Sequence, residues 1–273
     1  MTPRLSIVIV SFNARAHLVR CLESLRAAPP ATSHTIVVVD NASTDGSADA
    51  AREFPSVRVI TMGRNAGFAA ANNAGIRGSS GDLVLLLNND TIAPPGAIDR
   101  LVDRLLSDAT VGIAGARLVD GEGRAELSFG RMISPLSEAR QKVIGRLYHA
   151  RVGPVVRYVE RQTRREQFVD WVSGACLLVR RSAAESAGLL DERFFLYTED
   201  VDFCHAVRAL GYRVLFTPTA EIVHLRGQSR ATAAQAANVA YRRSHIAFYE
   251  KHHPKWAALL KAYLRLRGEG LKR

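Results

Sequence analysis

The sequence predicts an α/β fold with a mostly parallel central sheet flanked by helices. Apolar runs and amphipathic stretches alternate between residues 4 and 108, which is the arrangement of successive βαβ units. The apolar runs are nearly continuous, as expected for strands that are buried on both faces. The composition, 47% hydrophobic and 23% charged, is that of an ordinary globular chain.

The first half of the chain is expected to contain four strand–helix pairs. The strands fall at residues 4–12, 34–41, 56–62 and 82–90. The helices that follow them fall at residues 14–28, 43–54, 67–79 and 94–108. In the first of these helices the apolar side chains recur on one face, as Leu18, Cys21, Leu22 and Leu25. The second helix is expected to be capped by Ser43, Thr44 or Asp45.

The second half of the chain is less regular. Residues 128–167 are basic and show no pattern that predicts an element. After them we expect a strand at 172–181, a loop leading into a helix at 194–212, and strands at 212–225. The chain closes on a basic stretch whose apolar residues recur at helical spacing: Trp256, Leu259, Leu260, Tyr263 and Leu264.

Charge and missing motifs limit the classes of function. A net charge of +11 and a pI near 10.1 indicate an anionic partner, which leaves nucleic acid, a phosphorylated ligand and an acidic membrane open. Three scattered cysteines are too few for a disulfide framework or a zinc site. The sequence has no P-loop, dinucleotide-binding glycine motif, serine-hydrolase elbow or zinc-protease motif, which disfavours those enzyme classes.

Polar residues stand at the ends of the expected strands. The run "LLLNNDT" is the clearest case, because a fully apolar strand stops abruptly on two amides and a carboxylate. The polar residues that end the first, second and fourth strands are Ser11, Asn13, Asp40, Asn41, Asn88, Asn89 and Asp90. Ligands of open α/β sheets bind outside the carboxyl ends of the strands, so these side chains are expected to converge on one binding site.

Two of these aspartates have two interpretations each. Asp40 is either a turn residue that leaves a strand or a carboxylate that accepts a hydrogen bond from the N–H of a pyrimidine base. Asp90 either caps the next turn or binds a hard cation such as Mg²⁺ or Mn²⁺. A single carboxylate cannot hold such an ion alone, so a diphosphate, water and another side chain would have to complete the shell.

The stretch "YTEDVDFCH" and a later histidine also carry chemistry. Glu199, Asp200 and Asp202 either complement the dipole of a helix capped by Thr198 or include a general base beside the apolar "RFFLY" approach. Such surroundings raise the pKa of a carboxyl group. His224, at a strand end, is either a structural residue or a ligand for Mn²⁺.

Seven segments, taken in order, resemble the family 2 glycosyltransferases, and most closely their bacterial rhamnosyltransferase-like members. They are "SIVIVSFN", "VVVDNASTDGS", "GRNAGFAAANN", "LLLNNDT", "WVSGACLLVRR", "DERFFLYTEDVDFCHAVRALGY" and "HLRGQS". The resemblance implies a GT-A nucleotide-diphospho-sugar-binding domain at residues 1–230. Its nucleotide-binding half would span 1–120 and its acceptor and catalytic half 121–230, followed by a basic amphipathic helical extension at 231–273.

The resemblance also implies the role of each site residue. It assigns contacts with the nucleotide-sugar to Ser11, Asn13, Asp40, Arg64, Asn65 and Asn89. It assigns a Mn²⁺ or Mg²⁺ ion to Asp90 and His224, the catalytic base to Asp200, and the sugar and acceptor pocket to Trp171, Ser173, Gly174 and Glu199. The chain departs from the family at "NND", which lacks the first aspartate of the Asp-x-Asp signature and so gives His224 more weight.

The reaction that the resemblance implies is transfer of a sugar with inversion at the anomeric carbon. The expected donor is dTDP-L-rhamnose, with UDP-GlcNAc or UDP-galactofuranose as alternatives, and the expected acceptor is a lipid-linked or cell-envelope glycan. The Q-x-x-R-W motif of processive synthases is absent after "TED", so one or a few sugars are expected per acceptor. From another class, a non-catalytic nucleic-acid-binding protein is disfavoured by dispersed arginines and few aromatic residues, so no nucleic-acid partner is expected.

The expected location is the cytoplasm. No apolar run reaches the roughly 18 residues of a membrane-spanning helix, and the first run is too short to predict a signal peptide. The C-terminal stretch predicts either a helix docked on the domain or an amphipathic helix on an anionic bilayer. The second interpretation places the protein at the inner face of the cell membrane as a peripheral protein.

Overall fold

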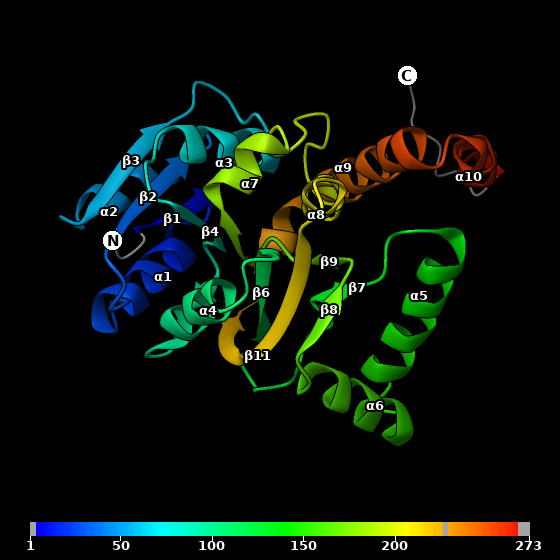
Figure 1. Cartoon of the computed structure of the whole chain (residues 1–273). Helices are drawn as coiled ribbons and strands as arrows, with labels where there is room; N and C mark the ends of the chain where they lie inside the picture. Colours follow the sequence, from blue (N-terminus) through cyan, green and yellow to red (C-terminus); the bar gives the residue numbers. More distant parts are fainter. Residues whose placement is uncertain (1–3, 226–228, 267–273) are drawn as a thin grey trace.

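The computed structural model describes residues 4–225 and 229–266 and confirms the expected α/β architecture (Figure 1). A nine-stranded sheet forms its centre, in the order β3-β2-β1-β4-β10-β6-β11-β5, with β8 paired to β11. Its strands are β1 (Leu5–Ser11), β2 (His34–Asp40), β3 (Val57–Thr61), β4 (Leu83–Asn88), β5 (Thr91–Ile92), β6 (Val111–Val119), β8 (Gln167–Val169), β10 (Cys176–Arg180) and β11 (Arg213–His224). A second, small sheet joins β7 (Phe129–Gly130) to β9 (Trp171–Val172).

The directions of the strands bring their carboxyl ends to one edge. β1 is parallel to β2 and β4, and β2 is parallel to β3. β10 is antiparallel to both β4 and β6, while β11 is parallel to β6. The sheet is therefore mostly parallel, as expected, and β1, β2, β4, β6 and β11 all end at the same edge.

Helices cover both faces of the sheet. On one face α1 (Arg15–Ala27) and α4 (Ala97–Leu106) pack in the same cluster as Ile9. On the other face α3 (Phe68–Arg77), α7 (Arg181–Ser186) and α8 (Glu199–Ala209) pack in the same cluster as Val8. Neighbouring residues of β1 thus face opposite cores, which explains why its central residues, 7–10, are all apolar.

Two details of the expected elements are wrong. Helix α2 (Ser47–Arg52) has Gly46 at its N-cap, one position after the expected caps. The carboxylate of Asp45 still accepts a hydrogen bond from the backbone N–H of Ser47, at 3.0 Å. The strand expected at 172–181 is divided into β9 and β10 by the turn at 173–175, which faces the pocket described below.

Two helices occupy the segment in which no element was expected. They are α5 (Pro135–His149) and α6 (Gly153–Thr163). Ser134 caps α5 through a reciprocal pair of hydrogen bonds with Ser137, and Pro135 stands at the first helical position. No residue of α5 is buried, so the sequence carries no core-facing stripe from which the helix could be predicted.

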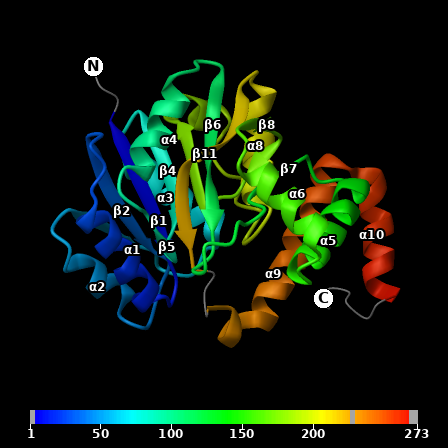
Figure 2. The ribbon, with the colours of Figure 1, turned by 90° about the horizontal axis from the view of Figure 1, so that it is seen from below.

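The C-terminal stretch forms α9 (Ser229–His252) and α10 (Pro254–Leu266). Phe248 and Tyr249 of α9 are buried in the cluster that contains α8. The apolar stripe expected on α10 is divided: Leu260 and Leu264 pack inward, whereas Trp256, Leu259 and Tyr263 are at least half exposed. Both ribbon views place α10 and α5 at the same end of the molecule (Figures 1 and 2). Among the helices that the structure describes, none is long and apolar enough to cross a membrane.

Candidate active site

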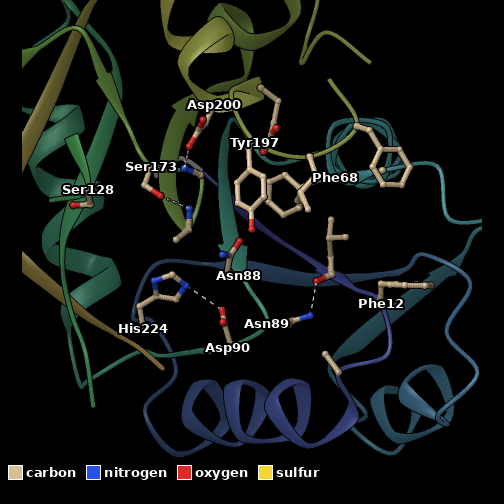
Figure 3. Close-up of a pocket in the computed structure, with 18 of the residues that line it drawn as sticks. Phe12, Phe68, Asn88, Asn89, Asp90, Ser128, Ser173, Tyr197, Asp200 and His224 are labelled. Carbon is tan, nitrogen blue, oxygen red and sulfur yellow. Dashed lines mark hydrogen bonds and ion pairs between the residues drawn. The ribbon is translucent and has the colours of Figure 1, made fainter. Parts of the chain in front are cut away.

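A pocket of about 500 Å³ lies at the carboxyl edge of the sheet (Figure 3). Nine of the thirteen residues to which the family resemblance assigns a role line it: Asn65, Asn89, Asp90, Trp171, Ser173, Gly174, Glu199, Asp200 and His224. Four more are not among the lining residues, although each is next in the chain to one that is: Ser11, Asn13, Asp40 and Arg64. The convergence expected at the strand ends is therefore present, with the nucleotide-side residues just outside the pocket wall.

The pair Asp90 and His224 is assembled by the pairing of β5 with β11. This pairing aligns His224 with Thr91, the residue after Asp90. The backbone N–H of Leu225 also donates to the carbonyl of Asp90, at 2.8 Å. As a result Nε2 of His224 lies 3.2 Å from Oδ1 of Asp90, and both side chains are mostly buried. One oxygen and one nitrogen donor thus point at each other across one corner of the pocket (Figure 3).

Glu126 is a lining residue that sequence reasoning missed. Its Oε2 lies 3.1 Å from Nδ1 of His224, so the imidazole is held between two carboxylates. Burial by itself lowers the pKa of His224, but the hydrogen bonds and charges of Asp90 and Glu126 raise it to about 9. No local pattern marks Glu126, because the turn between β6 and β7 brings it to the site from 98 positions away.

Asp200 lies at the opposite end of the pocket, in the first turn of α8 (Figure 3). Its Oδ2 accepts a hydrogen bond from the backbone N–H of Gly174 at 2.9 Å, and its Oδ1 accepts from that of Val201 at 2.8 Å. Burial raises the pKa of the carboxyl group above its ordinary value, and these hydrogen bonds oppose the increase. The turn after β9 therefore fixes the orientation of Asp200, which is what a general base requires.

The other acids of the "TED" stretch have different surroundings. Glu199 lines the pocket, and burial together with the charge of Asp200 raises its pKa well above the ordinary value. Asp202 instead accepts from Lys251 and His252 of α9, at 2.8 and 2.6 Å, and is not among the lining residues. Thr198 occupies the N-cap position as expected, but its side chain makes no capping hydrogen bond.

The ends of β1 and β2 contain buried polar atoms that have no partner among the described residues. They are Oγ of Ser11 and Oδ1 of Asp40, on paired positions of β1 and β2. The other oxygen of Asp40 accepts from the N–H of Ser43 at 3.2 Å, so the turn interpretation of this residue is confirmed. Buried acceptors and donors without partners are costly, and a bound polar ligand would satisfy them.

The remaining residues on this side are held by hydrogen bonds within the loops. Oδ1 of Asn13 accepts from the N–H of Thr44 at 2.8 Å. Oδ1 of Asn65 accepts from the side-chain amide of Asn41 at 2.9 Å. Nδ2 of Asn89 donates to the carbonyl of Val10 at 3.0 Å. Arg64 is exposed.

An aromatic wall is the second feature that sequence reasoning did not assign to the site. Phe12, Phe68, Phe195 and Tyr197 line the pocket, and Figure 3 shows Phe68 and Tyr197 side by side above Asn88. The backbone N–H of Phe68 donates to the carbonyl of Phe195 at 2.7 Å, which joins the start of α3 to the loop before α8. The apolar "RFFLY" stretch was the available signal, and it does supply part of this wall.

Sequence comparisons place the chain among sugar transferases. The sequence model of the family described as "Glycosyl transferase family 2" matches residues 6–187. The chain is 32% identical to the N-acetylglucosaminyl-diphospho-decaprenol L-rhamnosyltransferase of Mycobacterium tuberculosis, over 97% of this chain and 90% of that protein. It is 30% identical to the O-antigen biosynthesis protein RfbC of Myxococcus xanthus, over 85% of this chain and 18% of that one.

Structural comparisons agree on the fold. The mannosyltransferase PcManGT from Pyrobaculum calidifontis, in complex with GDP-Man and Mn²⁺, superposes with a TM-score of 0.64 at 19% identity, over 96% of this chain and 69% of that one. GalNAc-T7 with UDP, GalNAc and Mn²⁺ gives a TM-score of 0.63 at 16% identity, over 89% and 48%. The fold is the GT-A glycosyltransferase fold. Because the family match spans most of the chain and the mycobacterial relative aligns with nearly all of it, the protein is a glycosyltransferase and belongs to family 2.

Proposed function

We propose that the protein is an inverting, metal-dependent rhamnosyltransferase that moves L-rhamnose from dTDP-L-rhamnose to a hydroxyl group of a lipid-linked glycan. The observation that carries the proposal is the shared pocket. It holds a candidate metal pair, Asp90 and His224, at one end and a candidate base, Asp200, at the other. The name of the mycobacterial relative supports both the rhamnosyl donor and an acceptor that begins with a lipid-linked N-acetylglucosamine.

The residues present fit a Mn²⁺ or Mg²⁺ ion. A carboxylate oxygen and an imidazole nitrogen 3.2 Å apart can both turn to one cation. Both metals commonly take one or two protein ligands and complete their shell with substrate phosphates and water. When bound, such an ion neutralises the charge that develops on the departing nucleoside diphosphate. Glu126 accepts from the other ring nitrogen and so holds the imidazole with Nε2 toward Asp90.

The nucleotide would bind along the ends of β1 and β2. Ser11 and Asp40 offer the buried polar atoms without partners described above, and a base N–H suits the free oxygen of Asp40. Asn13, Asn65 and Asn89 would contact the ribose and the diphosphate, with the exposed Arg64 beside them. The chain's excess of positive charge favours an anionic donor of this kind.

The catalytic step follows from the position of Asp200. Its carboxylate would take the proton from the acceptor hydroxyl while that oxygen attacks the anomeric carbon. The base and the candidate diphosphate site lie at opposite ends of the pocket, so attack comes from the face opposite the leaving group and inverts the configuration. Trp171, Ser173, Gly174 and Glu199 would shape the sugar and acceptor pocket around this line.

UDP-GlcNAc and UDP-galactofuranose are the alternative donors. The aromatic wall formed by Phe12, Phe68, Phe195 and Tyr197 favours rhamnose, because a 6-deoxy sugar presents a methyl group where other hexoses present a hydroxyl. With a lipid-linked acceptor, the protein would work at the inner face of the cell membrane as a peripheral protein.

The test is a transfer assay with the full chain. The purified protein is incubated with each of the three donors and an N-acetylglucosaminyl-diphospho-lipid, with Mn²⁺, with Mg²⁺ and with EDTA. The proposal expects a mass increase of one deoxyhexose from the rhamnosyl donor alone, lost with EDTA, and an inverted anomeric configuration by NMR. Transfer only from a UDP-sugar would contradict the rhamnosyl donor. Full activity in EDTA would contradict the dependence on a metal ion.

A further inference from the structure

Helix α5 exposes an apolar stripe that the core does not use. Leu136, Val143 and Leu147 are spaced by seven and four residues, so they lie along one side of the helix. Their exposed fractions are 81%, 54% and 38%. No residue of α5 is buried, and none belongs to the two hydrophobic clusters of the described residues. Contiguous exposed apolar surface of this kind marks a site of contact with something else.

Basic residues flank this stripe. Arg140, Lys142 and Arg146 are exposed on the same helix, to either side of the apolar residues. Residues 131–166, which contain α5 and α6, hold nine Arg or Lys and only three Glu. This short segment therefore carries more than half of the chain's net charge of +11. The partner of such a surface must be both apolar and anionic.

Helix α10 also exposes an apolar stripe. Its inner side packs through Ala257, Leu260 and Leu264. Its outer side exposes an apolar stripe whose members are between 50% and 89% exposed: Trp256, Leu259, Tyr263 and Leu266. Both ribbon views show the two helices at the same end of the molecule (Figures 1 and 2).

Helix α9 holds the two stripes in place. Glu138 of α5 pairs with Nε2 of His245 at 2.5 Å and accepts from the hydroxyl of Tyr249 at 3.0 Å. Nε2 of His253 lies 2.8 Å from the carbonyl oxygen of Ile133, just before α5. These contacts fasten α5 to the helix whose Phe248 and Tyr249 are buried in the core. Helix α5 is therefore held in place by α9, whose side chains reach the core.

We propose that the exposed apolar stripes of α5 and α10, with their flanking arginines and lysines, form a surface that docks on an anionic lipid bilayer. Amphipathic helices with aromatic and leucine side chains on one face and basic residues beside them lie in the interface of such bilayers. Nearby Lys and Arg add attraction to anionic headgroups. This inference rests on the proposed function for its purpose, because a lipid-linked acceptor is delivered in that plane.

A second copy of the chain fits this surface less well than a bilayer does. In a two-fold interface the same patch lies on both sides, so the arginines and lysines of residues 131–166 would face each other. Like charges brought together in this way oppose association. An anionic bilayer instead supplies the opposite charge and an apolar interior at the same time.

The test is co-sedimentation of the full chain with vesicles. We expect binding to phosphatidylcholine vesicles that contain phosphatidylglycerol, little binding to phosphatidylcholine alone, and weaker binding in high salt. The triple variant Leu136→Ser, Val143→Ser and Leu147→Ser should weaken binding by about tenfold or more. The corresponding variant of Trp256, Leu259 and Tyr263 should do the same. Matched controls, Leu106→Ser at the end of α4 and Leu210→Ser just after α8, change exposed leucines elsewhere and should bind as the wild type does.

Two further measurements make the result decisive. The fluorescence of Trp256 should shift to shorter wavelength on anionic vesicles, and Trp256→Phe should lose that shift while keeping most of the binding. Unchanged binding by both triple variants would overturn the proposal. A concentration-dependent dimer that the same substitutions abolish would also overturn it. The same holds for binding to a duplex oligonucleotide, without vesicle binding, that these substitutions abolish.

The docking proposal and the proposed function fail in different ways. With a short-chain, water-soluble acceptor, the triple variants should keep the turnover of the wild type, because they lie outside the pocket. Loss of vesicle binding with full turnover on this acceptor supports docking. A wild type that binds vesicles but transfers no sugar would contradict the function and leave docking supported.

Discussion

The sheet half of the molecule and its helical lobe use apolar side chains in opposite ways. In residues 4–119 every strand of the parallel sheet sits between two packed clusters, and the helices bury one face each. In the lobe formed by α5, α6 and α10, α5 buries nothing and α10 leaves its largest side chains exposed. The first arrangement stabilises a fold. The second leaves apolar surface available for an external partner.

The candidate active site lies outside that lobe, where residues 4–119 meet residues 120–225. Asp90 and the other strand-end residues come from the first of these segments, whereas Glu126, Asp200 and His224 come from the second. The contact between Phe68 and Phe195 joins them directly. On the proposals above, donor binding and catalysis would share this junction, and contact with the acceptor's surroundings would fall to the helical lobe.

The largest expected effect is at the junction. Asp200→Asn should lower kcat by roughly 10³-fold, because an amide cannot accept the acceptor's proton, and should change nucleotide affinity only a few-fold. The measurements are turnover and calorimetric nucleotide binding. Asp49→Asn is the matched control, because Asp49 is exposed and pairs only with Arg52 among the described contacts. This variant should keep the turnover and nucleotide affinity of the wild type. Full activity in Asp200→Asn would move the base to Glu199, since Asp202 is paired with α9.

The candidate metal pair should show the next largest effect. Asp90→Ala and His224→Ala each remove one of two proposed ligands, so each should abolish most of the gain in nucleotide affinity that Mn²⁺ provides. Binding without metal should change much less. Titration of each variant with nucleotide, in Mn²⁺ and in EDTA, measures both. If the wild type binds nucleotide with equal affinity in Mn²⁺ and in EDTA, the proposed metal site is wrong.

Glu126→Gln tests the residue that orients His224. Loss of such a supporting carboxylate typically lowers metal affinity by about 10–100-fold. We expect a decrease of that size in Mn²⁺ affinity, measured in the presence of nucleoside diphosphate, with the fold unchanged by circular dichroism. An effect as large as that of His224→Ala would instead make Glu126 a direct ligand.

Gly67→Ala tests the contact between the start of α3 and the loop before α8. Gly67 has a φ of +90°, and an added Cβ would lie 2.5 Å from the carbonyl oxygen of Phe195. The loop before α8 must then shift, at a cost of roughly 1–3 kcal/mol, and Asp200 shifts with it. We expect a lower melting temperature and a lower kcat. Gly63→Ala, where the added Cβ meets nothing within 4 Å, should change neither.

The smallest effect concerns the link between α5 and α9. Hydrogen bonds and charge from His245 hold the pKa of Glu138 below its ordinary value, against the opposing effect of burial. A carboxyl group with a lowered pKa stabilises the fold above its unfolded pKa, near 4.5, and the contribution disappears as the pH falls through the folded value. Glu138→Gln should therefore lower the free energy of unfolding at pH 7 by about 1 kcal/mol, which is measured as a lower melting temperature. The difference in melting temperature between the variant and the wild type should shrink toward pH 3. A constant difference would contradict this.

The sheet half could be predicted from sequence because its periodicities are simple. Continuous apolar runs marked β1 to β4, and one-sided stripes marked α1 and α4. Helices α5 and α6 could not be found in this way, because a helix with no buried face carries no core-facing period. The break between β9 and β10 was hidden because Ala175 and Cys176, beside the turn, are as apolar as the strand itself.

Some residues of the candidate site could be predicted from sequence and others could not. Strand-end residues such as Asp40 and Asp90 were predictable, because the direction of parallel strands fixes where their ends meet. Glu126 and the aromatic wall were not, because loops from distant parts of the chain bring them to the pocket and no local spacing encodes that. The roles assigned through the family resemblance stay predictions until the variants above are measured.

The measurement that tests the central claim most directly is a calorimetric titration of the full chain with dTDP, UDP and GDP, each with and without Mn²⁺. We expect a clear preference for one pyrimidine diphosphate, with the tightest binding for dTDP. Mn²⁺ should tighten this binding, and Asp90→Ala should lose that gain in affinity. Equal binding of all three nucleotides, or binding that Mn²⁺ leaves unchanged, would contradict the assignment of this edge of the sheet to a metal-bound nucleotide-diphospho-sugar.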